Sequence, residues 1–428
     1  MLAGACTDAH LALSPAPALY SDDIPYPAET VPEHQRSTEA ALYYVTDRNM
    51  QPASRGGVAY GHERSASMAF GVATTRFGGV ADWTQLVERS TLEGRRIPVD
   101  LTVTHREEIA RFPATPLEFE LRDGRPVTTE AARAAQGARI ETFQRTMAQA
   151  LKASARPDAL VFIHGFRHDF DEGHASLANI WHYSGRASVP VLYSWPAGNP
   201  GLFGYFRDRE SGEFTVHHLK QFLRMLADTP GLERIQIVAH SRGTDIATTA
   251  LRELIIAERS AGRDPRATLK VDALILAAPD LDFGVVGQRL VAERFGPAFG
   301  QITAYLNPDD NRLGLAEALM SGTRFGRISF DEVAPQIRTT LANVPNVHFV
   351  NVSSVTGRHR HSYFRNNPHV LADIVLKLRT GASPGTPERP LEPAAGNFWR
   401  LPPDYPAQDI PGAYGVAGHD RAASAPAR

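Results

Sequence analysis

Cysteine is nearly missing from this sequence, since Cys6 is the only one among 428 residues. A single cysteine excludes a disulfide within the chain and a thiolate metal cluster, and its place near the start argues against a catalytic thiol. The sequence also lacks H-E-x-x-H or a comparable metal-binding template, so we expect neither a metal nor a cofactor. Any chemistry must come from other side chains.

Excess charge and long apolar runs are missing too. The 45 Lys and Arg residues nearly balance the 47 Asp and Glu residues, leaving a formal net charge of −2, so we expect no nucleic-acid partner. No apolar run reaches the roughly 18 residues that a transmembrane helix needs. As written, the sequence indicates a cytoplasmic protein. If its start is the end of a truncated lipoprotein signal, Cys6 would be lipidated and would anchor the protein in the cell envelope.

Composition predicts four parts along the chain. A tail poor in apolar residues is expected at each end, and the long helix is expected to begin after Thr128 or Thr129. The expected parts are a disordered N-terminal segment (1–38), a β-rich lead-in that ends in a long helix (39–157), an α/β core (158–380) and a Pro/Ala-rich C-terminal tail (381–428).

Six apolar runs carry the fold prediction for the core. They contain few alternating polar residues, as expected of parallel strands that are covered on both faces, and helical stretches separate most of them. They are ALVFIHG, VPVLYSW, RIQIVAH, VDALILAAP, QITAYLN and VHFVNVS. The alternation predicts a doubly wound, mostly parallel sheet with its site at the carboxyl ends of the strands.

One serine lies on the turn between a predicted strand and a predicted helix, in RIQIVAHSRGTDIATTALREL. A sharp turn of this kind makes a serine hydroxyl protrude, and it requires small residues two positions away on either side. Ala239 and Gly243 meet that requirement around Ser241, although alanine departs from the first glycine of G-x-S-x-G. The alternative is a serine that merely caps the helix.

Seven segments carry a resemblance that spans roughly residues 43 to 375. They are YYVTDRN, VFIHGF, VLYSWPAGN, IVAHSRG, LAAPDLDF, YLNPDDNRL and GRHRHSYF. Together they resemble the alpha/beta-hydrolase fold and, within it, an uncharacterised bacterial esterase/lipase-like family. The resemblance implies serine hydrolase chemistry without a cofactor, but it implies no particular substrate.

The His-Gly pair at the end of the first core strand suggests an oxyanion hole. In hydrolases of this type the turn after that strand supplies one backbone N–H group and the residue after the nucleophile supplies the other. Those residues are Phe166 and Arg242 here.

The acid and the base must follow the nucleophile in the order acid, then histidine. Asp310 is the predicted acid, because the resemblance aligns it with the family's strand-then-acid segment, and Asp280 is the alternative. His361 heads the family-like His-Ser-Tyr-Phe segment and is the predicted base. His359 is flanked by arginines and is expected to face solvent.

The predicted function is cleavage of a small-molecule carboxylic ester through an acyl-enzyme. Ser241 would attack, His361 would move the proton and Asp310 would orient the imidazole. The alternative is a catalytically silent hydrolase-like domain that serves binding or scaffolding.

A further segment, 197–210, follows the VPVLYSW strand and is rich in glycine and aromatic residues. We predict that Phe203, Tyr205 and Phe206 form a mobile lip over the site that influences acyl-chain preference. The alternative is that these aromatic rings pack a short helix onto the domain.

Overall fold

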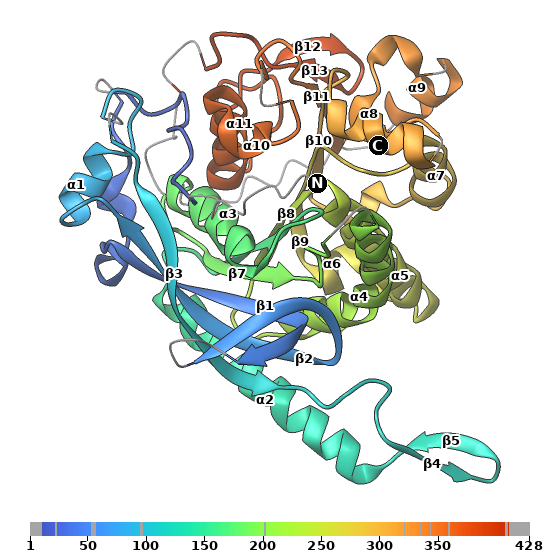
Figure 1. The fold of residues 1–428 in the computed structure, drawn as a ribbon. Coiled ribbons are helices and arrows are strands. Elements are labelled where there is room, and N and C mark those ends of the chain that lie inside the picture. Colours follow the sequence, from blue (N-terminus) through green and yellow to red (C-terminus); the bar gives the residue numbers. More distant parts are fainter. Residues whose placement is uncertain are drawn as a thin grey trace, which may run out of the picture.

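The computed structural model describes most of the chain. The described residues are 11–21, 24–52, 57–94, 97–200, 203–320, 322–333, 335–342, 344–357, 360–406 and 410. They form one 11-stranded sheet in the order β12-β13-β11-β10-β9-β8-β6-β7-β1-β2-β3, with helices on both faces (Figure 1).

In this order, every neighbouring pair from β13 through to β1 is parallel, whereas the pairs β1–β2, β2–β3 and β12–β13 are antiparallel. The strands of the sheet are β1 (Glu39–Pro52), β2 (Val58–Gly78), β3 (Asp100–Arg111), β6 (Asp158–Ile163), β7 (Val189–Ser194), β8 (Arg234–His240), β9 (Val271–Ala277), β10 (Gln301–Leu306), β11 (Val347–Asn351), β12 (Glu392–Ala395) and β13 (Phe398–Arg400). The six predicted core strands are β6 to β11, so the predicted doubly wound, mostly parallel sheet is confirmed.

Two layers of helices explain why the core strands are apolar on both faces. Helices α2, α4 and α5 contribute to one hydrophobic core, and α3 and α11 contribute to the other. The helices are α1 (Trp83–Glu88), α2 (Glu130–Ala153), α3 (Phe170–Tyr183), α4 (Gly204–Ala227), α5 (Arg242–Ser260), α6 (Pro265–Leu269), α7 (Phe283–Val285), α8 (Asn311–Met320), α9 (Pro335–Ala342), α10 (Tyr363–Asn366) and α11 (Pro368–Thr380). The Thr129 side chain caps α2 by accepting the N–H of Ala132, as the sequence predicted.

The lead-in is continuous with the core. Strand β1 pairs in parallel with β7, so no structural break separates residues 39–157 from the rest. A small hairpin of β4 (Phe119–Arg122) and β5 (Arg125–Thr128) stands apart near the start of α2 (Figure 1).

The N-terminal segment is ordered from residue 11, which corrects the prediction of disorder up to residue 38. Leu13 and Leu19 are buried, and the hydroxyl groups of Tyr20 and Tyr26 donate to carbonyl oxygens at the end of α3 at 2.8 and 2.9 Å. Leu13, Leu19, Tyr20 and Tyr26 belong to the hydrophobic core that α3 and α11 also form. The expectations for residues 1–10, including Cys6, lie outside the described residues.

The predicted C-terminal tail is also ordered in its first part. Residues 381–406 add β12 and β13 to the sheet, and Leu391 and Leu401 are buried. Arg389 is fully buried and forms a two-pronged ion pair with Asp373, at 2.9 and 2.8 Å. Composition misses this anchor because an arginine counts as polar wherever it lies. Residues 411–428 lie outside the described residues.

Candidate active site

Ser241 lies on a strained turn between β8 and α5. Its backbone has φ 51° and ψ −126°, a region that non-glycine residues rarely occupy and that is typical of functional sites. A Cβ atom on Gly243 would overlap the carbonyl oxygens of Ile163 and His164, so only glycine fits there. Ala239 is fully buried in the adjoining core, so its methyl group is accommodated. The departure from G-x-S-x-G therefore leaves the turn intact.

The structure brings Ser241, His361 and Asp310 together in one hydrogen-bonded chain. His361 Nε2 lies 3.0 Å from Ser241 Oγ, and His361 Nδ1 lies 2.7 Å from Asp310 Oδ2. Because an ionised carboxylate can only accept, Nδ1 carries the proton and Nε2 is free to accept one from the serine hydroxyl. All three side chains are buried, with the histidine the most exposed of them at 9%.

Asp310 is held by the start of the helix that follows it. Asp310 Oδ1 accepts the N–H groups of Arg312 and Leu313 at 3.0 and 3.1 Å, which leaves Oδ2 for the histidine. Asn307 lies three residues earlier, and its amide donates to the carbonyl oxygen of Arg360 at 2.7 Å. One short loop thus positions both Asp310 and the segment that carries His361.

Three rings, those of Tyr363, His240 and Phe364, hold the loop that carries His361. The Tyr363 hydroxyl donates to the carbonyl oxygen of Tyr305 at 2.8 Å and accepts the N–H of Ala278 at 2.9 Å. The His240 ring lies 4.3 Å from that of Phe364, centre to centre, and its Nε2 lies 3.3 Å from the carbonyl oxygen of His361. Burial lowers the pKa of His240 well below its usual value, so this ring stays neutral.

The turn after β6 lies directly against the serine, where an oxyanion hole would be formed. A Cβ on Gly165 would lie only 3.0 Å from Ser241 Cβ. Among the described residues we find no acceptor for the backbone N–H of Phe166 or of Arg242. Both groups are therefore free to donate to a substrate oxygen.

Arg48, from β1, ties this turn to the end of β7. It is 1% exposed, and burial lowers its pKa to about 10, so it remains charged at neutral pH. Its guanidinium contacts Ser194 Oγ at 2.8 Å, His164 Nε2 at 3.2 Å and the carbonyl oxygens of Gly61, Ala197 and His168 at 2.9, 2.7 and 2.7 Å. No local pattern identifies this role, because it depends on strands that meet only in the fold.

Asp280 contacts other groups than the His361 ring. Its carboxylate is 3.3 Å from the Tyr205 hydroxyl and 3.6 Å from Arg324, and its N–H is 3.4 Å from the Ser241 carbonyl oxygen. Burial, together with the charge of Asp280, raises the pKa of Tyr205 to about 12, so the tyrosine hydroxyl stays protonated. The carboxylate at hydrogen-bonding distance from His361 is that of Asp310. His359 lies outside the described residues.

The segment expected to form a lip begins helix α4. Phe203 is 67% exposed and Phe206 is 44% exposed, while the Tyr205 ring packs edge-on against Phe166 with centres 5.1 Å apart. Buried Asp208 accepts the N–H groups of Gly198 and Asn199 at 3.0 Å each, so both ends of the segment are anchored. Gly201 and Leu202 lie outside the described residues. The exposed phenylalanines argue against a purely packing role.

A search of the described residues for a metal site finds no group of three or more His, Cys, Asp or Glu side chains that could hold an ion. Within the same residues, no helix has the length and apolar character to span a membrane.

A family model described as "Alpha/beta hydrolase of unknown function (DUF900)" matches residues 140–379, which is more than half of the chain. No curated protein matches. The matched region begins within α2 and ends within α11, so it includes Ser241, Asp310 and His361.

Proposed function

Because the chain belongs to this alpha/beta hydrolase family, we propose that it is a serine esterase that cleaves carboxylic esters through an acyl-enzyme. One observation carries the proposal: the unbroken path from Ser241 Oγ through the His361 imidazole to Asp310. A serine that merely capped α5 would not need a buried imidazole at its oxygen, and Ser241 makes no side-chain cap bond to that helix.

In the first half of the reaction, Ser241 Oγ attacks the ester carbonyl carbon and its proton passes to His361 Nε2. The carbonyl oxygen becomes negative and accepts hydrogen bonds from the N–H groups of Phe166 and Arg242, each worth about 3 kcal/mol. Asp310 stabilises the imidazolium. The C–O bond to the leaving group then breaks, His361 gives its proton to the departing alkoxide, and the acyl group stays on the serine.

In the second half, water replaces the alcohol. His361 Nε2 takes a proton from the water as its oxygen attacks the acyl carbon, and the same two N–H groups stabilise the second oxyanion. The bond to Ser241 Oγ then breaks, the serine regains its proton from His361, and a carboxylic acid leaves. No cofactor takes part in this cycle.

The lip supplies substrate preference in this proposal. Phe203 and Phe206 offer exposed apolar area beside the turn that carries Phe166, and Tyr205 links that area to Asp280. An acyl chain that leaves the ester carbonyl on this side would cover those rings.

The test is a series of p-nitrophenyl esters from acetate to decanoate, with the purified full chain and with Ser241→Ala. We expect release of nitrophenol with saturation kinetics, and a preference among acyl lengths. The matched control is Ser211→Ala, which alters a serine on α4 that bonds only Arg64. If the wild-type chain and Ser241→Ala are equally inactive on every ester, the domain is catalytically silent and serves binding or scaffolding instead.

A further inference from the structure

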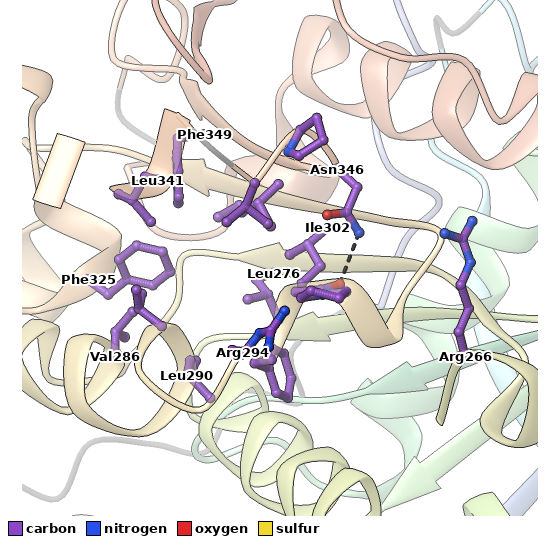
Figure 2. A pocket seen from close by; sticks show the side chains of 18 residues that line it. Arg266, Leu276, Val286, Leu290, Arg294, Ile302, Phe325, Leu341, Asn346 and Phe349 are labelled. Carbon is purple, nitrogen blue, oxygen red and sulfur yellow. Dashed lines mark hydrogen bonds between the residues drawn. The ribbon is translucent and has the colours of Figure 1, made fainter. Parts of the chain in front are cut away.

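A cavity of about 570 Å³ lies on the face of the sheet that α5 covers. Ser241, His361 and Asp310 do not line it. Its inner wall comes from strands β9, β10 and β11, and its cover comes from α9 and the π-helix Val286–Val291 (Figure 2). The apolar side chains that line it include Leu276, Ile302, Ala304, Phe325, Leu341 and Phe349.

The local architecture explains why space remains there. Strand β8 is covered by α5, a helix of 19 residues. Over β10 and β11 the cover is shorter: α7 has three residues and continues as the six-residue π-helix, and α9 has eight. π-Helices are rare and occur frequently at functional sites. The gap in the helical layer is thus a feature of the chain's own secondary structure.

The charged groups around this cavity are all of one sign. Arg266 and Arg294 are the only charged residues among those that line it in the described part of the chain, and no carboxylate accompanies them. The remaining polar side chain, Asn346, donates to the carbonyl oxygens of Gly296 and Phe299 at 2.9 and 3.0 Å. Figure 2 shows Phe325 at one end, Arg266 at the other and Arg294 between them. The end of the cavity at Phe325 is therefore apolar, and the two cations lie at the middle and at the opposite end.

We propose that this cavity binds one long-chain carboxylate, a fatty acid, with its tail toward Phe325 and its charged group toward Arg294 and Arg266. The volume lies within the range of about 300–1,000 Å³ that is usual for small-molecule sites. Apolar walls favour an apolar occupant over water, and the two arginines favour an anionic head group over a neutral one. This site is separate from Ser241 and does not depend on ester hydrolysis.

The experiment measures binding to the full chain that carries Ser241→Ala, so that catalysis plays no part. cis-Parinaric acid is the fluorescent probe, and octanoate, dodecanoate, palmitate and hexadecan-1-ol compete with it. We expect one saturable site, with at least about tenfold tighter binding of dodecanoate than octanoate because more methylene groups are buried. Palmitate should bind at least about fivefold more tightly than hexadecan-1-ol.

Variants locate the site. Leu290→Trp fills the cavity from its cover and should weaken palmitate binding at least tenfold, and Ala304→Phe fills it from β10. Arg294→Gln should remove the advantage of palmitate over the alcohol. Arg125→Gln, at the distant β4–β5 hairpin, is the matched control and should change neither. Thermal unfolding checks that each variant folds, and the Arg294→Gln result stands even if both filled variants fail to fold.

Three outcomes overturn the proposal. They are no saturable binding of the probe, equal affinity for palmitate and hexadecan-1-ol, and unchanged binding to a folded Leu290→Trp variant. A chain ending at Ile410 tests another occupant: if only this shortened chain binds palmitate, the cavity holds the chain's own C-terminal segment and the proposal is wrong.

Discussion

Ser241, His361 and Asp310 on one side, and the apolar cavity on the other, lie along neighbouring strands of one sheet. They differ in how the side chains are packed. At the end of β8, Ser241, His361 and Asp310 are buried and joined by hydrogen bonds, which fixes their geometry before any substrate arrives. Over β10 and β11, where the covering helices are short, apolar side chains of the described residues surround a cavity. The fixed side chains at the end of β8 suit catalysis, and the cavity over β10 and β11 suits the binding of a small molecule.

The largest effect should come from removing the nucleophile or the base. Ser241→Ala and His361→Ala should each lower ester turnover by at least about three orders of magnitude, because either change removes the covalent route. Leu290→Trp, in the cavity, should leave turnover within about twofold. Steady-state kinetics on one p-nitrophenyl ester compares the three. Variants of the triad that stay within tenfold of the parent would refute the assigned roles.

The second-largest effect should be the difference in turnover between variants of the two candidate carboxylates. Asp310→Asn should reduce turnover by about two to four orders of magnitude, since the amide no longer holds the imidazole in the required tautomer. Asp280→Asn should change turnover less than about tenfold and should mainly lower the melting temperature, because Asp280 faces Arg324 and Tyr205. Kinetics and thermal unfolding of both variants check this, and the reverse pattern would make Asp280 the acid.

A substitution of Arg48 tests how far the geometry of the turn after β6 depends on the lead-in (39–157). Arg48→Met leaves several buried acceptors without a donor, so we expect a loss of about 3 kcal/mol or more in the free energy of unfolding and at least tenfold slower turnover. Urea unfolding and kinetics measure the two effects. Arg64→Met, an exposed neighbour on β2, is the control. Unchanged turnover in a folded Arg48→Met variant would show that the turn after β6 positions itself.

Acid should lower the stability of the fold, because several histidines, among them His174 on α3, are buried; no histidine lines the cavity in the described part of the chain. Burial lowers the pKa of His174 from 6.5 to about 3. Because the unfolded chain then binds a proton before the folded one, the free energy of unfolding should fall as pH drops below 6.5, by about 1.4 kcal/mol per unit for this residue.

His174→Leu should therefore lose about 2 kcal/mol less than the parent between pH 7 and pH 5 in urea unfolding. Phe170→Leu, on the same helix, is the matched control, since it removes packing but no titrating group. Equal pH dependence in all three chains would contradict the neutral, buried state of His174.

The smallest effect should come from the lip. Replacing Phe203 and Phe206 with alanine should shift the preferred acyl length severalfold with little change in melting temperature, because both rings are largely in solvent. The p-nitrophenyl ester series and thermal unfolding measure this. Unchanged preference together with a large fall in melting temperature would assign the rings to packing.

Local patterns carried most of what could be predicted from the sequence. Strands β6 to β11 are continuous apolar runs, and the Ser241 turn has its small neighbours in sequence, so both could be recognised. The order of acid and histidine came from resemblance to the hydrolase fold. The distances that join them depend on loops such as the one carrying Asn307, whose role shows only when β10 and the histidine loop meet.

What escaped prediction depends on contacts between distant parts of the chain. Arg48 reaches three other segments of the chain, Arg389 pairs with Asp373, and Tyr20 and Tyr26 bind the end of α3. Each looks like an ordinary polar or tail residue in sequence. The cavity was missed for a similar reason, because unfilled volume arises from the length of the covering helices and has no motif.

The central claim is that Ser241 is an activated nucleophile, and a fluorophosphonate tests it without knowledge of the natural ester. The full chain, Ser241→Ala and His361→Ala are incubated with the probe, and the adduct is located by mass spectrometry of the peptides. The account predicts one stoichiometric adduct on Ser241, none on that peptide in Ser241→Ala, and labelling at least about a hundredfold slower in His361→Ala. No adduct on Ser241 in the parent chain, or equal labelling rates in the parent and His361→Ala, would contradict it.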